Sequence, residues 1–571
     1  MSRCLIFLLL LFIIACSSLK RNAQEAAVSL SETSATVLPL PSSAELARGQ
    51  LDSVAQADIE YASPASIRKA VNHLYSHSQR TPSSTHFQLT LATRLMRLLY
   101  PLEPIDWNVP SYKEENIYLN ALTQAADGTY PQTLGRGTFM DAVVPAFILI
   151  SGVSIGEYAD DLEIRLHKAQ QINPQSVLPF YLFGLLYERQ HRLSDAVTAY
   201  QAAWERDESC YPAGIHYARL ALTRNNTEKA YEIAQKLYIT YPQSISIQLL
   251  LAQTYIALGD LSKAETLVSA ILSKDGAYKE ALFLRVRIHL EKKEYLSASA
   301  LLDNYAKKDK SDKTYLLLRM RVLQEWTRNR AEAQRCLEKA EQLYPQASDV
   351  LLACAEFCFE THNIINGKAS EVFINTLLEQ DPQNLAALSL LLKQDLASGR
   401  WQAAVERAGH LQTIAPSEEH LVYYIRACIG IGNWQEALRI VYAAYTGAEK
   451  PSDEIVALYL ETLFGAKDYQ RLRQVISKKL ADARSSLKAV LYYYQAMLEP
   501  NNEEKLSLLR LSLLSDPRST LTLFALYQWY FAHKDYRKAA YYVQQVLALE
   551  PENKTYLALA EKLNRLLENE R

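Results

Sequence analysis

The chain has 571 residues, of which 49% are hydrophobic and 22% are charged, a composition typical of folded proteins and too apolar for an intrinsically disordered one. Its 61 Lys and Arg residues are balanced by 63 Asp and Glu residues, so it lacks the excess positive charge that binds a nucleic-acid backbone, and we expect no nucleic-acid partner. Only 17 glycines and 20 prolines interrupt the chain, which favours helices and predicts few or no strands.

Residues 1–15 have the pattern of a secretory signal peptide. An apolar run from residue 5 to residue 14 follows Arg3; it is too short to span a bilayer but has the length of a signal-peptide core. The run ends in Ile13-Ile14-Ala15-Cys16, which resembles the lipobox of bacterial lipoproteins. The alternative interpretation is an ordinary signal peptide with an incidental cysteine.

The lipobox resemblance implies that cleavage falls before Cys16, that its thiol receives a diacylglyceryl group, and that an acyl chain such as palmitate is added to the new amino group. Two or three acyl chains are enough for stable anchoring. The protein is then expected in the bacterial cell envelope, anchored to the outer or inner membrane with its body in the periplasm. Residues 16–55 are rich in Ser, Ala, Thr, Pro and Gln, which predicts a disordered tether.

Residues 56–142 form an N-terminal segment that precedes any repeat. The pattern predicts helices over Ala65–Tyr75 and Phe87–Tyr100, and irregular structure over Glu103–Thr138, where Pro, Gly and Asn are frequent. We interpret the segment as a helical cap on the body, because repeat arrays need capped ends. The alternative is a small functional domain.

Residues 143–551 contain about twelve copies of a repeat. Small or aliphatic anchor residues recur at spacings of 33 to 37 residues, and 34 is the commonest spacing. The anchor positions are Leu162, Ala196, Ala230, Ala264, Ala298, Ala333, Ser370, Ala404, Ala437, Leu472, Lys505 and Ala539. Twelve residues beyond seven of these anchors stand Pro174, Pro242, Pro345, Pro382, Pro416, Pro517 and Pro551. A fixed period of this length is the signature of stacked helical units.

Each unit has the features of a helical hairpin. Gly259 supplies the left-handed conformation that ends one helix, and Ala264 leaves room where the next helix crosses it. With the terminal prolines, these units resemble tetratricopeptide repeats, most clearly at Phe180–Ala203 and Gln248–Ile271. The resemblance implies an all-α fold, a right-handed superhelical solenoid of helix-turn-helix repeats. The pattern of residues 552–571 predicts a C-terminal capping helix.

Three positions depart from the repeat pattern. The anchor is large at Leu472 and at Lys505, and the residues Asn363–Lys368 are an insertion that lengthens a turn. We expect the units around these positions to be distorted or to form a bend.

No constellation of catalytic or metal-ligating residues is evident. The cysteines that follow Cys16 are odd in number and show no CxxC pair, although Cys354 and Cys358 could each join Cys336 under oxidising conditions. His73 and His77 are four residues apart, but the HExxH pattern of a zinc site is missing. The sequence therefore predicts a protein that is not an enzyme and that has no cofactor and no metal.

In the repeat family, ligands dock mostly on inward-facing positions of the first helix of each pair. The resemblance assigns to partner binding the residues Tyr181, Arg189, Arg219, Gln253, Phe283, Arg287, Lys393 and Phe524. This mixed aromatic and basic set suits an extended peptide or a folded partner with acidic groups. The Lys/Asn pattern with which family members clamp a C-terminal carboxylate is not matched.

The leading functional hypothesis is a lipid-anchored envelope scaffold that binds other envelope proteins or peptides through the concave face of the solenoid. A second hypothesis is an accessory component of solute uptake that works with a substrate-binding protein. A third is an envelope enzyme that uses residues 56–142, with Asp106, His86 or His77 in its site. The sequence leaves the partner, the membrane and the oligomeric state open.

Overall fold

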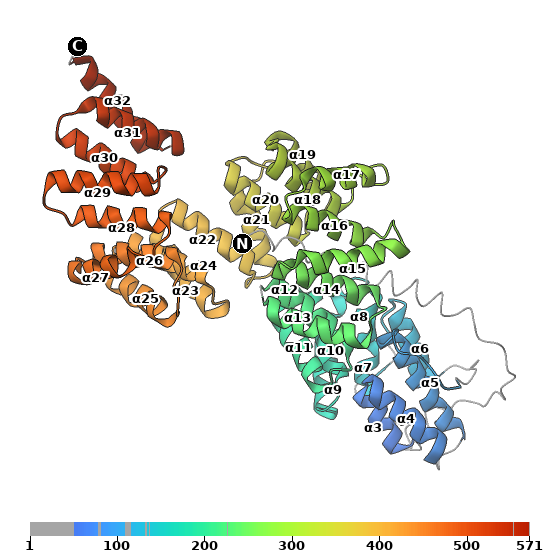
Figure 1. Cartoon of the computed structure of the whole chain (residues 1–571). Coiled ribbons are helices and arrows are strands. Elements are labelled where there is room, and N and C mark those ends of the chain that lie inside the picture. Colours follow the sequence, from blue (N-terminus) through green and yellow to red (C-terminus); the bar gives the residue numbers. More distant parts are fainter. Residues whose placement is uncertain are drawn as a thin grey trace. The chain divides into compact units, whose positions relative to one another are not determined.

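The computed structural model describes residues 51–77, 82–108, 116–131, 134–135, 137–224, 226–551 and 553–569. The predicted signal peptide, Cys16 and nearly all of the predicted tether lie outside these ranges. Within them every regular element is a helix (Figure 1), and the one strand-like feature is an isolated bridge between Ile365 and Lys368. The all-α prediction is confirmed. None of the described helices is both long enough and apolar enough to cross a membrane.

The N-terminal segment is helical over most of its described length. Its helices are α3 (Ser53–Tyr61), α4 (Pro64–His77), α5 (Pro82–Leu99), α6 (Ile117–Ala126), α7 (Phe139–Val143), η3 (Val144–Phe147), α8 (Ile148–Ser151) and η4 (Gly156–Tyr158). The expectation of irregular structure up to residue 138 was wrong for α6. The Asn116 side chain caps this helix by accepting hydrogen bonds from two backbone amides, and Leu119 and Leu122 are fully buried beneath it.

The N-terminal segment and the first repeats share one hydrophobic core, which runs from Ala55 to Leu251. Polar contacts cross the same boundary. The Ser176 hydroxyl donates to the Glu60 carbonyl at 2.6 Å, and the Leu102 amide donates to the Tyr211 hydroxyl at 2.8 Å. The segment is therefore packed as part of the repeat body over its described residues.

Pairs of antiparallel helices follow, after α9 (Ala159–Ile172). The first helices of the pairs are α10 (Leu178–Arg189), α12 (Tyr211–Thr223), α14 (Ile245–Leu258), α16 (Lys279–Glu291), α18 (Lys313–Val322), α20 (Ser348–Thr361), α22 (Leu385–Ala397), α24 (Glu418–Gly430), α26 (Asp453–Gly465), α28 (Ser485–Met497) and α30 (Thr520–Ala532). The second helices are α11 (Leu193–Arg206), α13 (Thr227–Thr240), α15 (Leu261–Lys274), α17 (Tyr295–Tyr305), α19 (Arg330–Leu343), α21 (Ser370–Gln380), α23 (Trp401–Ile414), α25 (Trp434–Gly447), α27 (Tyr469–Lys479), α29 (Asn502–Ser515) and α31 (Tyr536–Leu549). The last helix is α32 (Lys554–Asn569).

From α9 to α21 and from α23 to α32, each helix packs against the next one in the chain, and the first helices within each of these two runs also contact the first helix of the following pair. This pattern is that of a solenoid of stacked repeats. The chain divides into two compact units, residues 1–388 and residues 389–571. In the second unit, the fully buried Leu563 of α32 joins the core of the last repeat, as expected of a capping helix.

Apart from Leu162 in α9 and Ser370 at the start of α21, the anchor residues lie in the second helices, one turn after the helix begins. Ala264 is fully buried, and Asp260 caps its helix by accepting a hydrogen bond from the Lys263 amide. Gly259 ends the preceding helix with a φ of 82°, in the left-handed region. The predicted turn chemistry is therefore present in this repeat.

In most other repeats, a residue with a side chain occupies the position of Gly259. Positive φ angles between 52° and 61° occur at this position in His191, Lys293, Arg328, His362, Lys467 and Lys534. Because a side chain makes the left-handed region unfavourable by about 1–2 kcal/mol, these turns are held by the packing of the helices on either side.

The irregular repeat spacings have local structural causes. The 35 residues between Ala298 and Ala333 include one extra residue, which is taken up by the π-helical turn η5 (Leu323–Thr327). The insertion Asn363–Lys368 forms a tight turn in place of the first turn of α21, which begins only at Ser370.

The distortion expected at the two large anchors is not found. Leu472 is fully buried in α27, and Lys505 is half-buried in α29. Both helices are regular and carry side-chain caps, from Asp468 and Asn501. A side-chain cap and the later core positions of the helix are enough to keep the repeat in register.

Candidate partner-binding face

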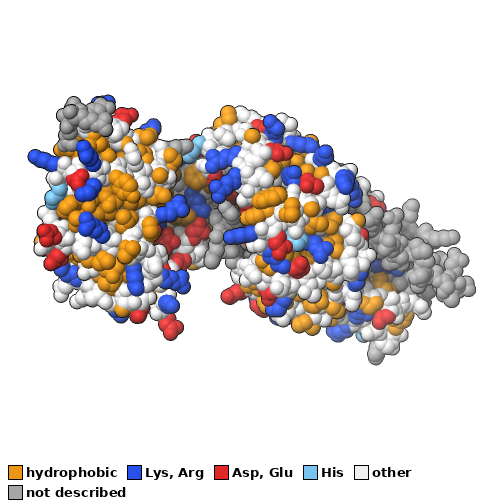
Figure 2. All heavy atoms as spheres, turned by 45° about the horizontal axis from the view of Figure 1, so that its top comes forward, with side chains coloured by type: hydrophobic (Ala, Val, Ile, Leu, Met, Phe, Trp, Pro, Cys, Tyr) orange, Lys and Arg blue, Asp and Glu red, His pale blue; other side chains and the backbone are white. Residues whose placement is uncertain are grey.

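All eight residues predicted to bind a partner lie on first helices, from α10 to α30. Arg219, Gln253 and Arg287 are spaced by 34 residues and continue in Arg321, so one position repeats in α12, α14, α16 and α18. We call these four residues the polar column. Packed helices lie about 8–10 Å apart, which matches about three residues of an extended peptide. Figure 2 shows positive and negative side chains interspersed on one face of the molecule.

Two members of the polar column hold buried polar atoms without a hydrogen-bond partner in the described part of the chain. They are Nε of Arg219 and Oε1 of Gln253, and Gln253 is only 6% exposed. Burial lowers the pKa of Arg219, and the nearby Glu188 carboxylate opposes that shift. A buried polar atom without a partner costs about 1–3 kcal/mol, so both atoms are suited to meet a ligand.

A cluster of hydrogen-bonded side chains supports Arg219. The Tyr200 hydroxyl donates to Glu188 Oε2 at 2.5 Å, and Nδ1 of His216 lies 2.9 Å from the same oxygen. The ring of Tyr181 meets the His216 ring edge-on, with centroids 6.2 Å apart. Burial, with the Glu188 charge, raises the pKa of Tyr200 well above its usual value. The phenol therefore stays protonated and keeps donating to Glu188.

Arg189 and Phe283 make contacts that hold the fold together. The Arg189 guanidinium donates to the Leu149 carbonyl at 2.5 Å and to the Val153 carbonyl, at the end of α8 where carbonyls lack helical partners. Phe283 is 6% exposed and packs edge-on against Tyr305. These contacts come from tertiary packing that the repeat register does not encode.

Lys393 and Phe524 belong to the second unit. Nζ of Lys393 lies 3.1 Å from Glu419 Oε1 and 5.6 Å from the centre of the Tyr423 ring. Burial disfavours the lysine charge, but Tyr423 and Glu419 outweigh it and raise the pKa of Lys393. Phe524 packs against the rings of Tyr527 and Tyr556.

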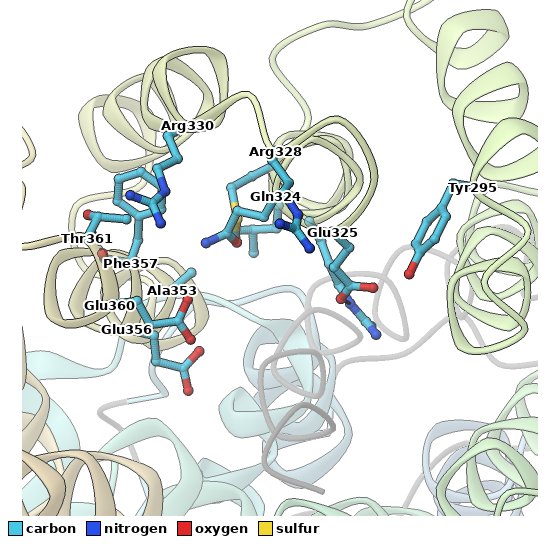
Figure 3. A pocket seen from close by; sticks show the side chains of 13 residues that line it. Tyr295, Gln324, Glu325, Arg328, Arg330, Ala353, Glu356, Phe357, Glu360 and Thr361 are labelled. Atoms are coloured by element: carbon cyan, nitrogen blue, oxygen red, sulfur yellow. Dashed lines mark hydrogen bonds and ion pairs between the residues drawn. The ribbon is translucent and has the colours of Figure 1, made fainter. Parts of the chain in front are cut away.

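A cavity of about 490 Å³ lies beside the polar column in the first unit (Figure 3). It is lined by Tyr295, Leu317, Met320, Arg321, Gln324, Glu325, Arg328, Arg330, Ala353, Glu356, Phe357, Glu360 and Thr361. Most of these residues come from α18, from the π-helical turn η5 and from α20. The sequence analysis missed this site, although the 35-residue spacing before Ala333 marked the place.

The wall of the cavity is fixed by ion pairs around Arg321. Its guanidinium lies 2.9 Å from Glu291 Oε1 and 2.7 Å from Glu325 Oε1. Burial disfavours the charge, but the hydrogen bonds that the guanidinium donates to both carboxylates raise the pKa of Arg321. Because Glu325 lies in η5, these pairs tie the π-helical turn to α16 and α18.

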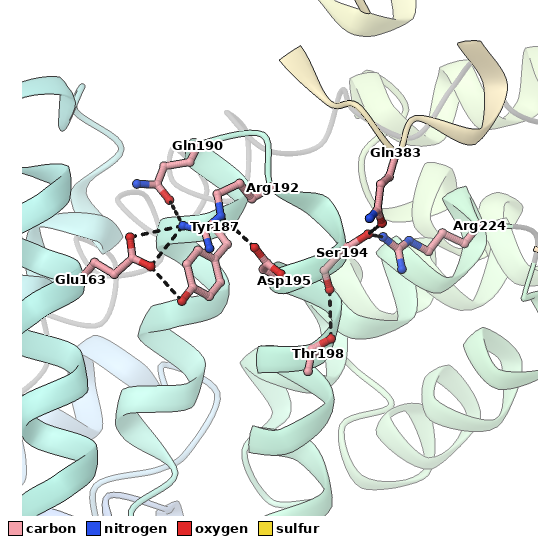
Figure 4. A network of polar contacts seen from close by, with 9 residues as sticks. All are labelled: Glu163, Tyr187, Gln190, Arg192, Ser194, Asp195, Thr198, Arg224 and Gln383. Carbon is pink, nitrogen blue, oxygen red and sulfur yellow. Dashed lines mark hydrogen bonds and ion pairs between the residues drawn. The ribbon is translucent and has the colours of Figure 1, made fainter. Parts of the chain in front are cut away.

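A polar network joins turns that are far apart in the first unit (Figure 4). The Ser194 hydroxyl donates to Gln383 Oε1 at 2.5 Å and accepts from the Arg224 guanidinium at 2.7 Å. On the other side, Arg192 pairs with Glu163 at 3.1 Å. The network thus links the start of α11 to the loop before α22.

Where they are described, the residues considered for an enzyme or a metal site have separate structural surroundings. His73 pairs with Asp52 at 3.2 Å, His86 is buried in α5, and Asp106 pairs with Arg68 at 3.0 Å. The side chain of His77 lies outside the described residues. Among the residues that are described, no group of three or more metal-ligating side chains comes together.

The cysteines within the described ranges are free thiols. Burial raises the pKa of Cys336 and of Cys358 to about 11. Cys354 is fully buried, and burial raises its pKa further. These groups are therefore protonated at neutral pH and are poor nucleophiles.

Comparisons with known proteins identify the repeats. Family models described as tetratricopeptide repeat match residues 181–245, 249–313 and 221–276. A search of curated proteins finds no match.

Three solved structures are similar in fold. The APC/C hetero-tetramer Cut9–Hcn1 is 15% identical over 90% of this chain and 99% of that chain, with a TM-score of 0.47. A tetratricopeptide repeat protein from Parabacteroides merdae is 16% identical over 44% of this chain and 99% of its own, with a TM-score of 0.31. Yeast Tom70 is 14% identical over 69% of this chain and 97% of its own, with a TM-score of 0.33.

The family-model matches establish tetratricopeptide repeats within residues 181–313, and the helix pairs extend the same architecture through residue 549. Solenoids of this kind generally bind protein partners.

Proposed function

We propose that this protein is a lipid-anchored envelope scaffold that binds a partner protein through the polar column of its first unit. The observation that carries the proposal is the pair of buried polar atoms, Arg219 Nε and Gln253 Oε1, which have no hydrogen-bond partner in the described residues. They occupy one register position in successive repeats, so an extended partner segment meets them in turn.

The local chemistry suits backbone recognition. The Gln253 amide carries both a donor and an acceptor, and the Arg219 guanidinium donates in a fixed fork. An extended peptide presents carbonyl and amide groups along its length, and acidic side chains would pair with Arg219 and Arg287. Bonds to a partner offset the desolvation that these buried groups incur in the unbound protein.

The first experiment compares partners that crosslink in cells to the wild type and to the double variant Arg219→Met/Gln253→Met. Methionine keeps the bulk of both side chains and removes the polar atoms, so we expect the variant to fold with at least wild-type stability and to lose its partner. The matched control is Gln235→Met/Lys274→Met, which changes exposed residues of second helices. Retention of the same partner by the folded Arg219→Met/Gln253→Met variant would refute binding at the polar column.

Lipid anchoring rests on the lipobox resemblance at Cys16 and is tested separately. Cells grown with labelled palmitate should incorporate the label into the wild type, and Cys16→Ser should remove the label and release the protein from the membrane fraction. An unlabelled wild-type protein would contradict the anchor while leaving partner binding intact.

A further inference from the structure

We propose that the cavity beside η5 is a docking site for a partner segment in which an apolar residue stands between an acidic and a basic one. This inference rests on the proposed function, because it assigns the chemistry of the segment that the first unit binds. The cavity is the continuation of the polar column, since Arg321 belongs to both.

The lining of the cavity is polar and apolar in similar measure, and its apolar part comes from four side chains. Leu317, Ala353 and Phe357 are each 1% exposed, and Met320 is 5% exposed. Its volume of about 490 Å³ falls within the range of protein ligand pockets, roughly 300–1,000 Å³. An aliphatic or aromatic side chain of a partner would lose its contact with water there, which is the main source of binding energy at such anchors.

The rim carries charges of opposite sign on two different elements. Arg328 stands on the turn after η5 and Arg330 begins α19, while Glu356 and Glu360 stand on α20, one helical turn apart. Figure 3 shows the two glutamate side chains extending together, below the two arginines in that view. A partner segment complementary to this rim has an acidic group at one end of its apolar residue and a basic group at the other.

The charge of Arg321 does not alter this separation of positive and negative side chains at the rim. Its ion pairs with Glu291 and Glu325 hold its charge within the wall. Arg328 and Arg330 are exposed, as is Glu360, so the charges that remain for a partner lie at the mouth of the cavity.

Arg328 occupies the turn position that has a positive φ in most of the repeats. Its φ is 52°, in the left-handed region, where glycine would avoid a cost of about 1–2 kcal/mol. The preceding π-helical turn is also a feature that occurs frequently at functional sites.

A peptide fits this site better than a free small molecule because the cavity is continuous with the register of inward-facing positions. Leu317 lies 34 residues beyond Phe283, and Arg321 lies 34 residues beyond Arg287. A chain that fills the cavity can therefore continue along α16 and α14, past Gln253.

The experiment selects peptides on the full chain from a displayed library of random twelve-residue sequences. We expect enriched sequences to carry an apolar residue flanked by an acidic and a basic one. Their affinities are then measured by fluorescence polarisation against the wild type and the variants Arg328→Gly and Glu360→Lys. The charge-matched controls, Arg335→Ala and Glu379→Lys, change exposed residues on α19 and α21.

Loss of a partly exposed ion pair predicts about fivefold weaker binding for Arg328→Gly and a larger loss for the charge reversal Glu360→Lys. Arg328→Gly relieves the strained backbone, so weaker binding by this variant cannot be ascribed to misfolding. Neutralising the acidic residue of the peptide should have no further effect in Arg328→Gly.

The proposal is overturned if no sequence is enriched, if the enriched sequences lack this charge pattern, or if both variants bind them as tightly as the wild type does. Those outcomes leave the polar column untouched, because the crosslinking of Arg219→Met/Gln253→Met reports on the proposed function separately. Equal binding of a free dipolar amino acid and of the selected peptides would identify a small-molecule site instead.

Discussion

Gly184 of α10 lies directly against the ring of Tyr200 of α11, so that a Cβ atom at residue 184 would stand 2.3 Å from Cε1 of the ring. The Tyr200 ring is fully buried and cannot move aside. We therefore expect Gly184→Ala to lower the free energy of unfolding by about 1–3 kcal/mol, as overpacking of a core does. Chemical denaturation measures the change. Gly156→Ala is the control, because a Cβ there meets open space, and an equal loss in both variants would contradict the explanation.

Lys293 should be replaceable by glycine with a gain in stability. Its φ of 61° is unfavourable for a residue with a side chain, so Lys293→Gly should raise the free energy of unfolding by about 1 kcal/mol. Ala270→Gly, at an exposed position inside helix α15, should instead lower it by about 0.5–1 kcal/mol. Denaturant titration of both variants checks the two signs, and a loss at residue 293 would show that the turn is not strained.

Arg165 fixes the loop that precedes α7. This 7% exposed side chain donates to the carbonyls of Leu134, Gly135 and Asp141 at 2.6–3.1 Å. Lysine cannot donate to three carbonyls in the planar arrangement of a guanidinium. Arg165→Lys should therefore lower the free energy of unfolding by about 2–3 kcal/mol and speed amide exchange at residues 137–143. Hydrogen exchange with mass spectrometry checks this. Arg192→Lys, at an exposed network, should cost under about 1 kcal/mol.

The buried His86 should make the free energy of unfolding depend on pH. Burial lowers the pKa of this histidine below its ordinary value near 6.5, so the unfolded chain binds its proton more readily than the folded one does. The contribution of His86 is therefore fully present above about pH 6.5 and is lost as the pH falls through 6.5 towards its lowered pKa. Denaturation at pH 7.5 and pH 5.5 should show a smaller drop for His86→Gln than for the wild type. The exposed His167→Gln should keep the wild-type drop.

The bond between Ser194 and Gln383 joins side chains 189 residues apart. In a background without native cysteines, Ser194→Cys/Gln383→Cys should react rapidly with a short bismaleimide to give an internal crosslink. Glu205→Cys/Gln383→Cys is the control, because residue 205 lies about 16 Å farther along α11. Mass spectrometry detects the product, and equal reaction of both pairs would show that the contact is transient.

The helix pairs could be predicted because their determinants are local and repeated. The small anchor residue of which Ala264 is one copy recurs at a nearly fixed spacing, and in the structure Ala264 is buried and Gly259 ends a helix as predicted. Helix α6 was missed because Pro and Gly dominate its surroundings in the sequence, while its cap depends on the single side chain of Asn116.

For the candidate site, the sequence could predict only which repeat position each residue occupies. The spacing correctly brings Arg219 and Gln253 to equivalent places on successive first helices, but it cannot show that Arg189 is held by the end of α8. Nor does an extra residue before Ala333 reveal where it is accommodated. A longer loop would have produced the same spacing, and only the structure shows a π turn beside a cavity.

The π turn also bears on how such a chain diverges during evolution. A single inserted residue would rotate the rest of a helix by about 100° and would normally disturb every later contact. Here the extra residue is absorbed before Asn329 caps the next helix, and Ala333 remains fully buried. The longer spacing is thus accommodated without realigning the downstream repeats, so a repeat array of this kind tolerates a one-residue insertion at the end of a first helix while the rest of its architecture stays unchanged.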